Sequence, residues 1–355
     1  MATIAIASFI GLTTPITRTQ GLSGHFPNPS SPFSSLKYSQ FRTTFSPSMA
    51  TTPIQVSASS SSSSSPAIDE KKGAGFSGIV GADDLLIVGP GVLGRLVAEK
   101  WRQEHPGCEI YGQTVTVDHH EELIKVGINP CLKGTKTDLK FPNVIFCAPP
   151  SRTSDYPGDV RVAALNWNGE GSFLFTSSSA PYDCNDNSPC DEDTPVVPIG
   201  RSPRTDVLLN AEKVVLEFGE YLYITGKLLV LFQSDLNYVY KADRGAHVYW
   251  LSKGTVDTNP DHVLNLIHYE DAASLSVAIL KKQLRNRILL GCDNHPLSRK
   301  EVMDLVNKSG KFTKVFESFT GTTDPLGKRL NNSKTRAEIG WEPKYPSFSQ
   351  FLESL

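Results

Sequence analysis

Three glycines with the spacing Gly-x-Gly-x-x-Gly, at Gly89, Gly91 and Gly94, form the pattern in this sequence with the clearest chemistry. Glycine at the first position permits a tight turn. At the second it lets main-chain amides approach a pyrophosphate, and at the third it lets a helix pack closely on a strand. The phosphates would then lie at the positively polarised start of the helix. This chemistry requires a strand before the turn and a helix after it.

The residues around the glycines can supply both elements. Residues 84–88 form a short apolar run, and residues 92–104 have helical spacing of apolar side chains before His105-Pro106-Gly107 ends the helix. Residues 109–114 are typical of a second strand. The four parts follow within about 30 residues, as in a mononucleotide-binding unit. We therefore predict a dinucleotide site, with a glycine-rich turn that binds no ligand as the alternative.

Further strands and helices alternate along the chain. Strands are expected at 143–147 and 171–176, and helices at 157–167 and 204–218. This alternation predicts an α/β fold with a doubly wound parallel sheet. Ligands of such sheets bind beyond the carboxyl ends of the strands. The residues predicted to bind the cofactor are those of the glycine turn and the strand ends: Gly89, Gly91, Val92, Leu93, Gly94, Gln113, Thr114, Cys147, Ala148, Pro149 and Ser177.

The end of the second strand bears on the choice of cofactor. Sites for NAD place Asp or Glu there, where it binds the ribose hydroxyls. Here the strand ends in Gln113-Thr114, and Asp118 follows too late. The missing carboxylate removes repulsion toward a 2′-phosphate, although no Arg or Lys follows at once to attract one. The sequence favours NADP over NAD and leaves both open.

Five stretches resemble the extended short-chain dehydrogenase/reductase family, which contains NAD-dependent epimerases and dehydratases. They are residues 89–94, 175–182, 191–195, 265–273 and 340–346. Together they are more specific than the glycine pattern alone, and the resemblance spans roughly residues 84–355. It implies a Rossmann domain that binds NAD or NADP.

The resemblance also implies a small substrate-binding lobe, contributed here mainly by residues 183–203 and 241–355. One stretch, residues 218–240, departs from the family pattern. A native insertion and a mispredicted exon boundary are both open explanations. The sequence does not identify the substrate or the oligomeric state.

The family's catalytic groups are only partly present. In the family, a Tyr hydroxyl acts as general acid and base, a Lys four residues later lowers its pKa, and a Ser polarises the substrate oxygen. The Tyr and Lys positions hold Arg204 and Leu208, which cannot replace them. Ser178 best matches the Ser, with a backbone-bonding hydroxyl as the alternative. We expect an atypical member whose proton donor, if it is an enzyme, is Ser178 or Tyr182.

Two classes of function remain open. The first is an oxidoreductase or an epimerase/dehydratase-like enzyme that acts on a small metabolite with a non-standard proton donor. The second is a non-catalytic dinucleotide-binding protein, such as a redox sensor or an assembly factor in the plastid.

The N-terminal region differs in composition from the rest. Residues 1–65 contain no Asp or Glu and three basic residues, Arg18, Lys37 and Arg42. This hydroxyl-rich, acid-free region is typical of a transit peptide. We expect a disordered transit peptide and Ser-rich linker at 1–65, a further linker at 66–82, a folded domain at 83–355 and a location in the chloroplast stroma. A disordered tail without a targeting role is the alternative.

Charge and hydropathy argue against a nucleic-acid-binding protein and against a membrane-spanning one. The net charge of the 355-residue chain is −2, so removing the +3 of residues 1–65 leaves −5 for the remainder. We therefore expect no nucleic-acid partner. No run of 18 apolar residues occurs, so no membrane span is expected.

The six cysteines have no spacing that resembles a metal site. We expect no metal. A redox-sensitive disulfide between Cys184 and Cys190 is a further possibility that their spacing leaves open.

Overall fold

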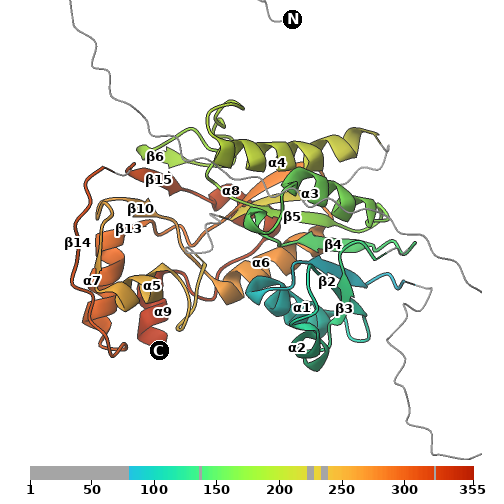
Figure 1. Ribbon diagram of the computed structural model, residues 1–355, viewed down its shortest axis with the longest axis horizontal. Coiled ribbons are helices and arrows are strands. Elements are labelled where there is room, and N and C mark those ends of the chain that lie inside the picture. The colour runs from blue at the N-terminus through green and yellow to red at the C-terminus, as the bar shows by residue number, and fades with distance from the viewer. Residues whose placement is uncertain (1–79, 136–137, 222–227, 233–238, 324) are drawn as a thin grey trace, which may run out of the picture. The chain divides into compact units, whose positions relative to one another are not determined.

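The computed structural model describes residues 80–135, 138–221, 228–232, 239–323 and 325–355 (Figure 1). The expected transit peptide, most of the linker at 66–82 and parts of the stretch 218–240 lie outside these residues. Among the described residues, no helix is long and apolar enough to cross a membrane.

A seven-stranded parallel sheet forms the centre of the fold, in the order β12-β7-β5-β4-β1-β2-β3. The chain first builds outward from β1 to β2 and β3, then crosses back to place β4 on the other side of β1. This reversal of direction confirms the predicted doubly wound sheet. The strands are β1 (Leu85–Val88), β2 (Ile110–Thr114), β3 (Asn129–Leu132), β4 (Asn143–Phe146), β5 (Phe173–Ser177), β7 (Leu228–Phe232) and β12 (Arg287–Gly291).

Helices cover both faces of this sheet (Figure 1). On one face α1 (Val92–Glu104) packs against α6 (Tyr269–Lys282), and on the other α3 (Tyr156–Leu165) packs against α4 (Pro203–Tyr221). Leu85 and Ile87 of β1 belong to the core on the α1–α6 side, and Leu86 and Val88 to the core on the α3–α4 side. A strand buried on both faces is apolar along its whole length, which is why residues 85–88 show no alternation.

A second, smaller sheet has the order β13-β10-β15-β6. It comprises β6 (Asp186–Cys190), β10 (Val263–Leu264), β13 (Leu297–Ser298) and β15 (Gly327–Leu330), and a separate core contains side chains of α5 (Ala246–Lys253), α7 (Arg299–Ser309) and α9 (Phe348–Ser354). Residues 183–203 and 241–355 thus supply this sheet, although the second range also supplies α6 and β12 to the main layers. That this region binds a substrate stays a prediction.

Short elements complete the described chain. Two strand pairs join β8 (Val239–Tyr240) to β11 (Ile267–His268) and β9 (Thr255–Val256) to β14 (Ser318–Phe319); the other helices are α2 (His120–Lys125), the 3-10 helix η1 (Pro150–Arg152) and α8 (Ser333–Ile339).

The buried carboxylate of Asp271, in the first turn of α6, fixes the C-terminal segment. It accepts hydrogen bonds from the main-chain amides of Lys344 at 2.7 Å and Tyr345 at 2.9 Å. Asp271 therefore links the main sheet's helix layer to the chain that leads into α9.

The close packing of α1 on β1 depends on Gly94. A Cβ at this position would lie 2.8 Å from Cγ2 of Ile87 and 3.3 Å from the carbonyl oxygen of Gly89. Real Cβ atoms essentially never lie within 3.0 Å of a non-bonded atom, so a side chain here requires Ile87 or the start of α1 to shift.

We predict that Gly94→Ala lowers the free energy of unfolding by about 1–3 kcal/mol, because it overpacks the α1–β1 contact. Gly91→Ala should change it by less than about 1 kcal/mol, since Gly91 has φ −75° and a Cβ there meets nothing within 4 Å. Urea unfolding of the two variants, followed by circular dichroism, measures both effects. Equal losses in the two variants would contradict this packing argument.

Candidate functional site

The glycine turn lies between β1 and α1, where the order of the strands reverses. Gly89 has φ +80°, and a Cβ there would lie 2.7 Å from both the nitrogen and the Cα of Ala148. The turn can therefore pass the end of β4 only because Gly89 has no side chain. Gly91 faces open space, since a Cβ at this position would meet no heavy atom within 4 Å. The turn thus leaves open, solvent-accessible space in front of Gly91.

Main-chain hydrogen bonds hold this turn against its neighbours. The amide of Gly89 donates to the carbonyl of Gln113 at 3.0 Å, and the amide of Cys147 donates to the carbonyl of Val88 at 2.8 Å. The ends of β1, β2 and β4 are therefore fixed to one another. The structure brings together the predicted residues of all three strand ends.

The start of α1 presents main-chain N–H groups near the open space in front of Gly91. Gly91 is the N-cap residue, and no acidic residue lies in the first turn of the helix. The first amides of a helix have no partner within it, so those of Val92, Leu93 and Gly94 are placed to bind an anion. Because the first turn carries no carboxylate, no charge on it repels a phosphate.

The end of β2 lacks an acidic side chain. Gln113 is half-buried, and Oγ1 of Thr114 lies 2.7 Å from Nε2 of His120 in α2. Asp118 is exposed and accepts a hydrogen bond from the hydroxyl of Thr116 at 2.8 Å. Thr114 is thus engaged with α2, and ribose binding by Gln113 and Thr114 stays a prediction.

The segment after β4 lies beside the glycine turn. Ala148 lies against Gly89, and its carbonyl accepts a hydrogen bond from the hydroxyl of Tyr156 at 3.0 Å. Burial raises the pKa of the Cys147 thiol to about 12. The Cys147 thiol is therefore neutral near pH 7. Cys147 is half-buried, and so is Pro149, the residue directly before η1.

The end of β5 carries a buried carboxyl that the sequence patterns did not single out as titratable. The hydroxyl of Ser177 donates to Oε1 of Glu212 at 2.5 Å, and both side chains are buried. Burial raises the pKa of Glu212 to about 7, while the hydrogen bond from Ser177 opposes that shift. Ser177 therefore points into the α4 side of the sheet.

The two predicted catalytic residues are both buried, but their hydroxyl groups differ in hydrogen bonding. Ser178 follows β5 and is buried, and its Oγ accepts a hydrogen bond from the amide of Ala180 at 3.2 Å. Tyr182 is only 2% exposed and packs in the core on the α3–α4 side, where its hydroxyl has no partner among the described residues. Burial raises the pKa of Tyr182 far above its usual range. Catalysis by either residue stays a prediction.

The structure describes both residues predicted to occupy the family's Tyr and Lys positions. Leu208 is buried in the core between α4 and the sheet, and Arg204 lies in the first turn of α4 with its side chain exposed. That these two positions correspond to the family's Tyr and Lys stays a prediction.

A buried lysine, which no sequence pattern indicated, fixes the loop after β5. Nζ of Lys328, in β15, donates to the carbonyls of Ser179 and Tyr182, each at 2.8 Å. Lys328 is 5% exposed, and burial lowers the pKa of its ammonium. The second sheet thus sets the position of the loop that contains Ser178.

Cys184 and Cys190 lie beside this lysine. Both are free thiols, Cys184 half-buried and Cys190 buried. Burial, followed by a hydrogen bond with the Cys184 thiol, raises the pKa of Cys190 to about 12. A disulfide between them stays a prediction. Among the described residues, no group of three or more His, Cys, Asp or Glu is placed to hold a metal ion.

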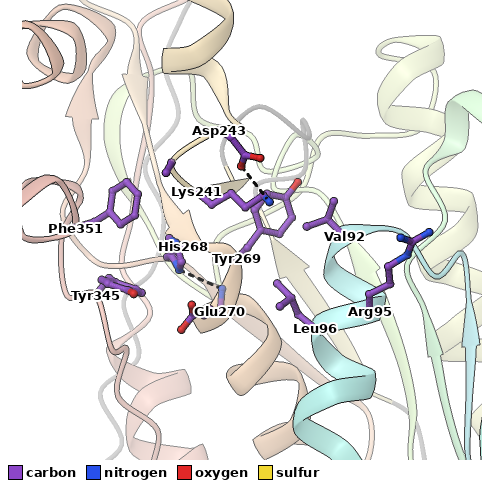
Figure 2. Close-up of a pocket in the computed structure, with 11 residues that line it drawn as sticks. Val92, Arg95, Leu96, Lys241, Asp243, His268, Tyr269, Glu270, Tyr345 and Phe351 are labelled. Atoms are coloured by element: carbon purple, nitrogen blue, oxygen red, sulfur yellow. Dashed lines mark hydrogen bonds and ion pairs between the residues drawn. The ribbon is translucent and has the colours of Figure 1, made fainter. Parts of the chain in front are cut away.

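A cavity of about 610 Å³ opens beside the first turn of α1, between α1 and the start of α6 (Figure 2). Its polar lining includes an ion pair between Lys241 and Asp243 at 3.0 Å and the ring of His268, which accepts a hydrogen bond from the amide of Glu270 at 3.2 Å. Burial lowers the pKa of His268 to about 4, so the ring is neutral near pH 7. His268 is the N-cap residue of α6.

Comparison with known proteins supports the fold. No family model and no curated protein matches the chain. Among solved structures, a protein of unknown function from Silicibacter pomeroyi is similar with a TM-score of 0.61 and 19% identity, over 77% of this chain and 97% of that one.

Two similar structures contain NAD. A dTDP-glucose 4,6-dehydratase from Bacillus anthracis has a TM-score of 0.60 and 15% identity, over 76% of this chain and 94% of that one. A UDP-glucuronic acid 4-epimerase from Bacillus cereus has a TM-score of 0.59 and 14% identity, with the same two coverages of 76% and 94%. These likenesses show that the chain has the Rossmann-type fold of epimerases and dehydratases.

We predict that stability depends on pH through Glu212. Unfolded, this carboxyl ionises above about pH 4.5, whereas folded it keeps its proton up to about pH 7. The native state therefore binds one more proton in that window, so this group makes stability fall as pH rises through it. Glu212→Gln should remove that fall, a gain of about 1–3 kcal/mol at pH 8 relative to pH 5.

Urea unfolding of the wild type and of Glu212→Gln at the two pH values measures this difference. Glu217→Gln is the matched control, because Glu217 lies on the same helix with a half-buried side chain and pairs with Lys213. An unchanged pH slope in Glu212→Gln would show that the carboxyl is ionised in the native state.

Proposed function

We propose that this chain binds a nicotinamide dinucleotide, with the pyrophosphate in the open space in front of Gly91. The geometry of the glycine turn carries the proposal. A Cβ at Gly91 would project into the open space where a pyrophosphate would approach the main chain, while Gly89 and Gly94 lack side chains because Ala148 and Ile87 leave no room for them. A separate physical reason therefore requires glycine at each of the three positions, and these are the reasons known for a dinucleotide-binding turn.

The surrounding fold supports the same proposal. The turn lies at the reversal point of a doubly wound sheet, where ligands of such folds bind. Solved structures of similar fold contain NAD. The absence of a carboxylate at Gln113 and Thr114 favours NADP(H) over NAD(H), because these last residues of β2 carry no charge that repels a 2′-phosphate.

We propose further that the protein is an oxidoreductase or an epimerase/dehydratase-like enzyme for a small metabolite. When bound, the nicotinamide ring would supply a hydride donor or acceptor. Ser178 lies at the end of β5, on a loop that Lys328 holds in place, and its hydroxyl can orient an oxygen of a substrate. The composition of residues 1–65 supports a plastid location, so plastid metabolites are the substrates to test.

A non-catalytic role is the second candidate, and two observations favour it. Leu208 occupies the position of the family's lysine, and the Tyr182 hydroxyl is enclosed in the core. A protein with this site would bind the dinucleotide without proton transfer, as a redox sensor does.

We predict that the full-length chain binds NADPH or NADH, measured by isothermal titration calorimetry. Gly91→Val should weaken binding at least about tenfold, because the added side chain occupies the pyrophosphate position. Its unfolding curve should stay close to that of the wild type, which separates lost binding from lost folding. If the wild type binds none of the four nicotinamide dinucleotides at millimolar concentration, the proposed function is wrong.

Turnover separates the two candidates. For an enzyme, we expect the chain with cofactor and a plastid metabolite extract to change the absorbance at 340 nm, at a rate that Ser178→Ala lowers about 10- to 100-fold. Ser188→Ala, which removes a hydroxyl in β6 that donates to the carboxylate of Asp186, should leave that rate unchanged. Intact binding without turnover in the wild type would favour the sensor.

A further inference from the structure

Arg95, the residue directly after the third glycine, lies over the glycine turn. Its Nε donates to the carbonyl of Pro90 at 3.4 Å, and its Nη2 lies 3.0 Å from Oε2 of Glu122 in α2. Figure 2 shows the side chain extending toward the N-terminal end of α1 and away from His268. The guanidinium is therefore held between the turn and α2.

Two further contacts show that β2 lies beside both the glycine turn and α2, the two elements that Arg95 contacts. A Cβ on Gly112 of β2 would lie 3.1 Å from Cγ of Pro90, so the proline ring rests on this strand. Thr114, the last residue of β2, contacts His120 of α2 at 2.7 Å. Arg95 thus touches both the turn residue that covers β2 and the helix that β2 leads into.

This corner is where the adenosine ribose of a bound dinucleotide lies, since the ribose of such ligands sits at the end of the second strand. A guanidinium has five N–H donors, and Pro90 and Glu122 take two of them. The remaining donors suit a phosphate, which arginine binds in a planar, forked arrangement.

Glu122 opposes this role. Hydrogen bonds from His119 and then Arg95 lower the pKa of Glu122, so its carboxylate is charged at neutral pH. The ion pair is exposed, with 33% and 53% of the two side chains accessible. Exposed pairs are weak, so a phosphate can replace Glu122 as the partner of Arg95.

On the basis of the proposed function, we infer that Arg95 binds the 2′-phosphate of NADP(H) and that Glu122 limits the affinity by competing for the same guanidinium. The selectivity for NADP(H) thus comes from the first turn of α1 and not from a basic residue after β2.

Fluorescence titration of the full-length chain with NADPH and with NADH tests this inference. We expect Arg95→Met to weaken NADPH binding by about tenfold or more and NADH binding by less than about threefold, because only NADPH carries the 2′-phosphate. Glu122→Gln should tighten NADPH binding about threefold by releasing the guanidinium. Raising the salt concentration should reduce the wild type's preference for NADPH.

Arg102→Met is the matched control, because Arg102 lies on the same helix and donates to the carbonyl of Gly127, far along α1 from the turn. It should leave both affinities unchanged. If Arg95→Met weakens both cofactors equally, or Glu122→Gln abolishes NADH binding, the inference is overturned; the second result would assign the ribose hydroxyls to Glu122. If the wild type binds neither cofactor, the proposed function itself fails, and this inference fails with it.

Discussion

The close contact between Gly89 and the main chain at Ala148 determines the geometry of the candidate site. Two parallel strands, β1 and β4, end at this point, and the first must turn away without a Cβ to clear the second. The contact fixes the direction in which α1 begins, and therefore where its unpaired amides point. The direction of the first amides of α1, the position of Arg95 beside the turn and the open space in front of Gly91 all follow from this one steric constraint.

Two sets of buried polar contacts hold the end of β5 and the loop that follows it. Glu212 on α4 binds the Ser177 hydroxyl beneath it, and Lys328 from the second sheet binds the carbonyls of Ser179 and Tyr182. Desolvating an ammonium and a carboxyl is costly unless their hydrogen bonds are satisfied. These polar contacts fix the residues on either side of Ser178. A rigid loop is equally compatible with catalysis and with simple binding.

Local patterns in the sequence were sufficient to predict β1, β2, β4 and β5 of the main sheet, whereas β3 was not predicted. The apolar run at 84–88 and the helical spacing at 92–104 predicted β1 and α1, because a strand buried on both faces is apolar throughout and a helix buried on one side has an apolar stripe. Lys328 could not be found this way, since its role depends on a contact 149 residues distant in sequence. Arg95 adjoins the glycine pattern and could have been singled out, but its proximity to Glu122 depends on how α1 and α2 pack.

The order of the strands has a consequence for synthesis on the ribosome. Strands β1 to β5 come from the first part of the domain and can pair as soon as they emerge, whereas β7 and β12 join the open edge of β5 much later. Until then that edge exposes main-chain donors and acceptors that can pair with another nascent chain. Chaperone binding during translation would protect this edge, and premature termination before β7 would leave an incomplete sheet that is prone to aggregate.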